Sequence, residues 1–130
     1  MLKKSLVFAL LATVLCSFFA MADHHKKSEG RVLRHVVMFQ FKDSSSKQDV
    51  QKVVKAFNAL PSKIDSIIDY EFGVNNSPEG LDNGFTHVFL VTFADEAGRA
   101  KYLPHPDHKA FVDVLKPHLE KVQVLDYWSK

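Results

Sequence analysis

The chain has 130 residues, 46% of them hydrophobic and 25% charged, which suits one domain with its own core and is too short for several. Its formal net charge is +2, and outside Lys3 and Lys4 the basic and acidic residues are equal in number, so we expect no nucleic-acid partner. The one cysteine, Cys16, cannot form an intrachain disulfide, so the core must stabilise the domain alone.

The N-terminus has the pattern of a secretory signal peptide. Two lysines precede an apolar run from Leu6 to Ala20, and small residues follow in the pattern Ala20-Met21-Ala22. The run is shorter than the roughly 20 apolar residues that span a bilayer. We therefore expect cleavage after Ala22 and no stable membrane anchor, with retention of the segment as the alternative. The expected parts are a signal peptide (1–22), a flexible leader (23–30) and one domain (31–130), in a periplasmic or secreted protein.

The expected leader starts with a candidate metal site. Cleavage after Ala22 exposes a free amine followed by Asp23, His24 and His25. A free amine, two backbone amides and a histidine in third place form the square-planar nitrogen site that Cu(II) or Ni(II) favours. This is a hypothesis about affinity only, because any secreted chain with this start would bind some copper.

The domain is expected to begin with a strand over residues 32–41. Its β-branched and aromatic residues are typical of a strand, and apolar residues fall on both faces. One face carries His35, Val37, Phe39 and Phe41, and the other carries Val36 and Met38. We therefore expect a strand that is buried on both sides.

An amphipathic helix is expected next. Ser46, followed three residues later by Asp49, is typical of a capped helix start, and Pro61 ends the pattern. The apolar residues at helical spacing between them are Val50, Val53, Val54, Phe57 and Leu60.

Two more strands are expected over residues 68–74 and 86–93, joined by the turn-rich segment 75–84. The first has one wetter face, because apolar Ile68, Tyr70, Phe72 and Val74 alternate with Asp69, Glu71 and Gly73. The second is apolar on both faces, with His87, Phe89, Val91 and Phe93 on one and Val88 and Leu90 on the other.

Helices over 95–103 and from Pro106 to about Lys121, and a last strand over 122–128, complete the pattern. The order strand, helix, strand, strand, helix, strand predicts an α+β protein, a ferredoxin-like βαββαβ unit with a four-stranded antiparallel sheet. Right-handed crossovers place both helical connections on the same sheet face. The other face would be a large bare apolar surface, so we expect a homodimer with the sheets face to face, a dimeric α/β barrel.

The segment from Tyr102 to His108, YLPHPDH, concentrates groups that transfer protons. Pro106 suits the first turn of a helix, so His105 is expected to cap that helix and His108 to lie in its first turn. On a helical wheel His108 falls in the apolar arc and should point toward the sheet. His105, Asp107 and His108 do not have a familiar zinc spacing, so we expect no metal there, and no cofactor.

Four motifs in this order resemble the stress-responsive dimeric α/β-barrel domain family. They are LRHVVMFQFK, GFTHVFLVTF, YLPHPDH and VLDYW, and together they cover Val32 to Trp128. The resemblance implies the same ferredoxin-like homodimer.

The resemblance also implies a site. In a plant polyketide cyclase of that family, a catalytic tyrosine and histidine match Tyr102 and His108 here, and further pocket histidines match His35 and His87. This implies His108 as the base and Tyr102 as the group that orients it. His35 and His87 each lie at the start of an expected strand, in phase with its phenylalanines. We assign both, with His105, to the ligand pocket.

Several functions remain open at this point. We expect a secreted protein that binds a small apolar or aromatic ligand between sheet and helices. The alternatives are a cofactor-independent cyclase-like or lyase-like enzyme that uses the pair Tyr102 and His108, and an enzyme similar to the monooxygenases of the same architecture. The segment could also be only a structural corner. A cavity that joins Tyr102, His108, His35 and His87 would favour an enzyme.

Overall fold

A computed structural model describes residues 30–129. The elements, in chain order, are β1 (Leu33–Phe41), α1 (Lys47–Asn58), the 3-10 turn η1 (Leu60–Ser62), β2 (Ile67–Val74), β3 (His87–Phe93), α2 (Glu96–Tyr102), α3 (Pro106–Leu115), the 3-10 turn η2 (Lys116–His118) and β4 (Leu119–Trp128). The strands form one antiparallel sheet in the order β2-β3-β1-β4, which confirms the predicted ferredoxin-like topology.

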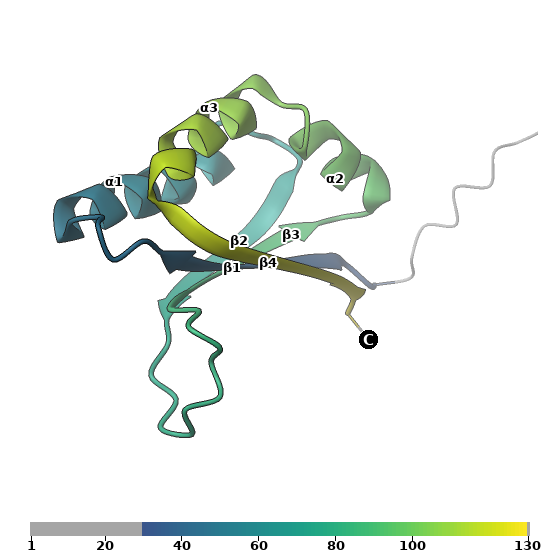
Figure 1. Cartoon of the computed structure of the whole chain (residues 1–130). Coiled ribbons are helices and arrows are strands. Elements are labelled where there is room, and N and C mark those ends of the chain that lie inside the picture. Colours follow the sequence, from purple (N-terminus) through teal and green to yellow (C-terminus); the bar gives the residue numbers. More distant parts are fainter. Residues whose placement is uncertain (1–29, 130) are drawn as a thin grey trace, which may run out of the picture.

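All three helices cover the same face of the sheet (Figure 1). The core lies between them and the two central strands, and its aromatic centre is a group of four phenylalanines: Phe39, Phe57, Phe89 and Phe111. Phe57 of α1 stacks on Phe89 of β3 with ring centroids 4.2 Å apart. The two helical crossovers therefore use one shared core, as the handedness of the crossovers predicted.

The start of α1 follows the sequence closely. Ser46 accepts a hydrogen bond from the backbone N–H of Asp49, and the Asp49 carboxylate accepts one from the backbone N–H of Ser46, so the predicted cap is a complete capping box. Val53, Phe57 and Leu60 are buried beneath the helix and the turn after it.

The last helix is shorter than predicted. We expected it to reach about Lys121, but α3 ends at Leu115 and β4 begins at Leu119. Pro117 has no backbone N–H and its ring obstructs a continuing helix, so the chain makes a 3-10 turn and enters the strand. His118 lies in that turn, where its Nδ1 is 2.9 Å from the Ser45 hydroxyl.

The phase of β2 was predicted wrongly at its start. The pairing with β3 shifts between Ile67 and Asp69, as at a β-bulge. Ile67 is therefore buried, whereas Ile68, which we had placed on the apolar face, is 53% exposed.

The sheet face opposite the helices has no cover within residues 30–129. Strand alternation places six apolar side chains on this outer face: Val36, Met38, Val88, Leu90, Leu125 and Tyr127. Leu125 and Tyr127 are about half exposed, at 53% and 51%. No helix among residues 30–129 is long and apolar enough to cross a membrane.

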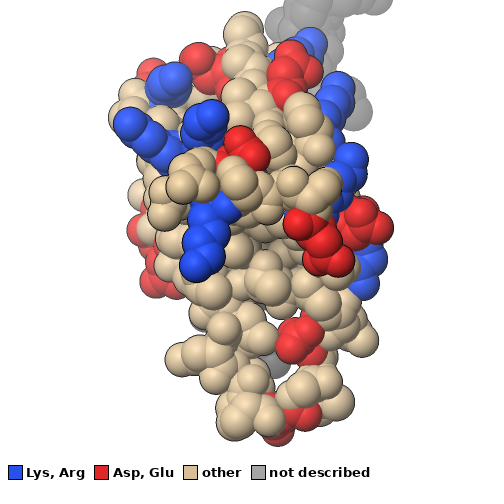
Figure 2. Space-filling view, turned by 60° about the vertical axis from the view of Figure 1, so that its left-hand side comes forward, with Lys and Arg blue, Asp and Glu red and all other residues tan. Residues whose placement is uncertain are grey.

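Charges of both signs share the surface. Figure 2 shows Lys and Arg interspersed with Asp and Glu on the face that it presents, with uncharged residues between them.

Candidate functional site

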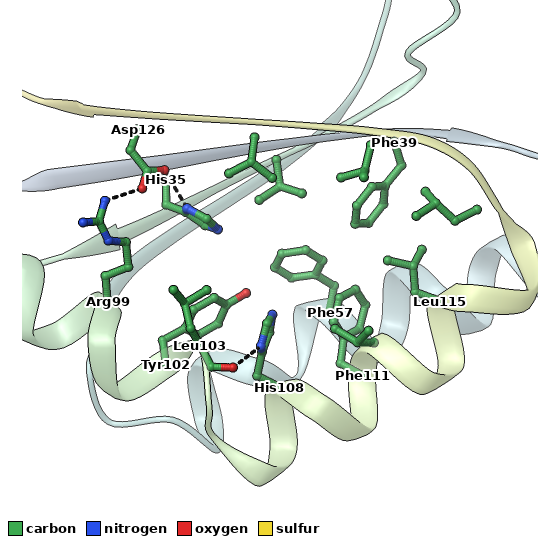
Figure 3. A pocket seen from close by; sticks show the side chains of 15 residues that line it. His35, Phe39, Phe57, Arg99, Tyr102, Leu103, His108, Phe111, Leu115 and Asp126 are labelled. Carbon is green, nitrogen blue, oxygen red and sulfur yellow. Dashed lines mark hydrogen bonds and ion pairs between the residues drawn. The ribbon is translucent and has the colours of Figure 1, made fainter.

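A cavity of about 550 Å³ lies between the sheet and the helices α2 and α3. Most of its wall is apolar, from Phe39 and Phe57 to the exposed side chains of Val122 and Val124 on the edge strand β4. Its polar groups gather at one end, where Figure 3 shows His35, Tyr102 and His108 directed toward the same space. The cavity is therefore a mainly apolar pocket with one reactive end.

His108, in the first turn of α3, has a defined tautomer. Its Nδ1 lies 3.0 Å from the carbonyl oxygen of Leu103, and a carbonyl can only accept, so Nδ1 carries the proton. The lone pair of the neutral ring is then on Nε2, which faces the cavity (Figure 3). Burial lowers the pKa of His108 below the ordinary histidine value, and the hydrogen bond to Leu103 opposes this shift. His108 is thus suited to accept a proton on Nε2 of its neutral ring.

Tyr102, the last residue of α2, is 1% exposed and lies between the two histidines. Its ring centroid is 4.2 Å from that of His108 and 5.8 Å from that of His35. Burial raises the pKa of the Tyr102 phenol well above its ordinary value, so the group stays protonated and acts as a hydrogen-bond donor. The phenol therefore orients or stabilises a ligand oxygen but does not serve as a base.

His35 approaches the same space from β1. Its Nδ1 lies 2.6 Å from a carboxylate oxygen of Asp126 on the neighbouring strand β4, and the other oxygen of Asp126 accepts a 2.5 Å hydrogen bond from the Arg99 guanidinium of α2. Because the carboxylate is an acceptor, Nδ1 of His35 carries a proton and Nε2 is directed toward the cavity (Figure 3). The side chain of His35 is 7% exposed, so this contact fixes its ring.

His87 does not line the cavity, although we had predicted it there. β1 and β3 are antiparallel, so the starts of the two strands lie at opposite ends of the pair, and His87 pairs with Phe39, four residues or roughly 13 Å along β1 from His35. Its ring instead packs edge-on against Phe41, with centroids 4.9 Å apart. Burial lowers the pKa of His87, and its Nδ1 is 2.7 Å from the Thr86 hydroxyl.

His105 caps α3, as predicted, but also lies outside this cavity. Its Nδ1 accepts a hydrogen bond from the backbone N–H of Asp107. It lines a different, more polar hollow with Lys63, Ser66 and Lys101. The role of His105 in the site is to begin the helix that carries His108.

Within residues 30–129, no group of three or more His, Cys, Asp and Glu side chains could hold a metal ion. The predicted copper or nickel ligands Asp23, His24 and His25 lie outside the described residues, so they remain a prediction from sequence.

Sequence reasoning missed two residues of the site, Arg99 and Asp126. A signal was present for Asp126, because it is the one charged residue in the alternating row Val122, Val124 and Asp126 on the helix-facing side of β4. Its partner could be identified only from the register that places it opposite His35.

The topology and the pocket between sheet and helices define a ferredoxin-like α+β protein of the kind that forms dimeric barrels. The family model of the stress responsive A/B barrel domain matches residues 33–129 of this chain. The chain therefore belongs to the stress responsive A/B barrel domain family.

Two relatives and two solved structures illustrate the likeness. The stress-response A/B barrel domain-containing protein HS1 of Arabidopsis thaliana is 33% identical, over 73% of this chain and 87% of that protein. Olivetolic acid cyclase of Cannabis sativa is 27% identical, over 73% and 94%. A dimeric ferredoxin-like protein of unknown function from Thermobifida fusca has a TM-score of 0.64 at 27% identity, over 76% and 92%. Hydroxynitrile lyase from Passiflora edulis has a TM-score of 0.72 at 24% identity, over 76% and 94%, a likeness of fold.

Proposed function

We propose that the pocket binds a small, mainly apolar or aromatic carbonyl compound, and that His108 removes a proton from it without a cofactor. The observation that carries this proposal is the hydrogen bond from Nδ1 of His108 to Leu103, which leaves Nε2 as an acceptor facing the cavity beside the Tyr102 phenol. An imidazole accepts protons near neutral pH, and the carbon between two carbonyls is acidic enough to donate one.

The shape of the pocket supports the ligand class. An apolar wall that includes Phe39, Phe57 and Leu115 favours an alkyl or aromatic body, and the polar end favours a carbonyl group there. The name of one relative, olivetolic acid cyclase, accords with carbon-acid chemistry on this scaffold.

The test uses benzoylacetone, an aromatic compound with an acidic carbon between two carbonyls. The enol form absorbs in the ultraviolet, so the approach of the keto and enol forms to equilibrium reports proton transfer between carbon and oxygen. We expect the protein to accelerate this conversion, and His108→Ala to remove the acceleration, because general base catalysis contributes typically about 10²–10⁴-fold. His118→Ala is the matched control, since His118 is bonded to Ser45 and does not line the cavity.

Binding without turnover is the second candidate, and the mostly apolar lining favours it. In that case benzoylacetone raises the melting temperature of the protein but its conversion is not accelerated. Val124→Trp should abolish this rise in melting temperature, because Val124 lines the cavity at a 48% exposed position, where the larger side chain would block entry. Val114→Trp, on an exposed part of α3 that does not line the cavity, is the control. Turnover that requires dioxygen would instead indicate chemistry like that of the monooxygenases.

We propose further that the protein is a homodimer joined through the outer sheet face. The support is the row of apolar side chains there, together with structural neighbours that are described as dimeric, one of them from Thermobifida fusca. Light scattering at micromolar concentration should give twice the mass of one chain, and a monomer would refute the proposal.

Secretion is also part of the proposed function. It is supported only by the sequence pattern of residues 1–22, which lie outside the described residues. N-terminal sequencing of the protein recovered from a secreting host should begin at Asp23, and a start at Met1 would contradict the proposal.

A further inference from the structure

We propose that His35, held by Asp126, is the proton donor of the site, opposite His108 as the acceptor. This inference rests on the proposed function of His108 and extends it, because a base alone does not complete a transfer from carbon to oxygen. The geometry that carries it is the chain of contacts from Arg99 through Asp126 to His35.

The two histidines have opposite surroundings. His108 lies among apolar walls, whose desolvation disfavours a charged ring and outweighs the opposing effect of its hydrogen bond to the carbonyl of Leu103. His35 lies 2.6 Å from a carboxylate, which stabilises a protonated ring by charge and by a hydrogen bond. Two titratable groups in such opposed surroundings divide the acid and base roles between them.

Other groups near His35 do not reverse this assignment. Those that face it are Asp126 from β4, Arg99 and Tyr102 from α2, His108 from α3 and the ring of Phe93 from β3. Arg99 is positive and opposes a second positive charge. Its guanidinium contacts the far oxygen of Asp126, however, whereas the ring of His35 contacts the near oxygen directly. The direct contact is the stronger one, because Coulomb energy falls with distance.

Arg99 and Asp126 are therefore positioning residues. Arg99 anchors one oxygen of the carboxylate, so the other oxygen stays aligned with Nδ1 of His35. This alignment directs Nε2 of His35 into the cavity (Figure 3).

A β-diketone has the acidic carbon that this pair of histidines requires. Nε2 of His108 takes a proton from the carbon between the carbonyls, and the electron pair of that C–H bond forms a carbon–carbon double bond. The carbonyl π electrons move to oxygen, which takes the proton from Nε2 of His35 and a hydrogen bond from Tyr102. His108 is then protonated and His35 is neutral, and proton exchange with water through the open mouth restores both.

The kinetic test is Asp126→Asn, which keeps the size of the side chain and removes its charge. We expect benzoylacetone still to bind, and its conversion to slow by about 10²-fold, the lower end of the range of about 10²–10⁴-fold for general acid–base catalysis. Asp126→Glu should restore part of the rate. Asp113→Asn is the control, because Asp113 is an exposed carboxylate paired with Lys116 on α3. An unchanged rate in Asp126→Asn, with His108→Ala inactive, would overturn the role of His35 and leave the proposed function intact.

A second test does not depend on turnover. Nitrogen-15 NMR of the histidine rings should show His35 protonated on both nitrogens at a pH at which His108 still has a bare Nε2. In Asp126→Asn, the Nδ1–H of His35 should lose the signature of its hydrogen bond to a carboxylate, while the ring of His108 is unchanged. If His108 gains its second proton before His35 as the pH falls, the inference is wrong, even where the protein accelerates no reaction of the probe.

Discussion

Placing a charge on the outer sheet face should dissociate the proposed dimer. Val36 is at the centre of this face, where Leu90 of β3 and Leu125 of β4 are its direct neighbours across the sheet. In Val36→Glu, a face-to-face dimer would have to bury one carboxylate from each copy. The penalty for burying an ion is several kcal/mol after relaxation, so two of them cost at least about 6 kcal/mol. Each 1.4 kcal/mol is roughly tenfold in affinity, so the dissociation constant should rise by about ten-thousand-fold.

The assay is size-exclusion chromatography with light scattering over a concentration series. We expect the wild-type protein to be dimeric and Val36→Glu to be monomeric, with its circular dichroism unchanged, because Val36 is only partly buried within one subunit. Val114→Glu is the matched control. It introduces the same side chain at a 42% exposed position on α3, on the other side of the sheet, and should remain dimeric. A Val36→Glu protein that is still dimeric would refute the proposed interface.

Three further predictions concern stability. Phe57→Ala should lower the free energy of unfolding by about 3–5 kcal/mol in urea, because Phe57 is fully buried and stacks on Phe89, whereas Val114→Ala should change it by less than about 0.5 kcal/mol. Ser46→Ala should cost about 1 kcal/mol and Ser46→Asn much less, since only alanine removes the cap; equal losses would contradict the capping role. Stability should fall as the pH drops below about 6.5, because the lowered pKa values of His87 and His108 leave the unfolded chain with more bound protons. The double variant His87→Gln, His108→Gln should lose that part of the pH dependence. An unaltered dependence of the free energy of unfolding on pH would show that protonation of neither histidine destabilises the folded protein.

The sequence was sufficient for the topology because each element has a local cause. The capping box at Ser46, the period-2 rows of the strands and the crossover rule together predict the sheet order and the single helical face. The two features that the sequence did not predict, a β-bulge and a helix end, depend on contacts between elements. The bulge at Ile67 appears only in the pairing of β2 with β3, and the end of α3 at Leu115 depends on how strongly Pro117 interrupts the helix.

The site shows the same division. The apolar arc of α3 was enough to predict that His108 points toward the sheet, because that direction depends on one helix and one sheet. The phase of β1 and β3 gave the correct face for both His35 and His87 but not their distance along the sheet. Face is a property of one strand, whereas distance depends on the direction and register of the pair. Asp126 and Arg99 were missed for this reason, since their connection to His35 joins three elements that are far apart in the sequence.

The two faces of β1 make the proposed interface and the proposed site separable by experiment. His35 faces the helices and lines the cavity, whereas its neighbour Val36 faces the other way. Residues of one chain suffice to form the cavity, so monomeric Val36→Glu should bind benzoylacetone with nearly the affinity of the wild type. A loss of binding in the monomer, with Val114→Glu unaffected, would instead show that the partner supports the edge strand β4. That strand carries Asp126 and Val124 into the wall and has no neighbour other than β1 among residues 30–129. In that case dimerisation would be a condition for the alignment of His35 and not only a cover for the outer face.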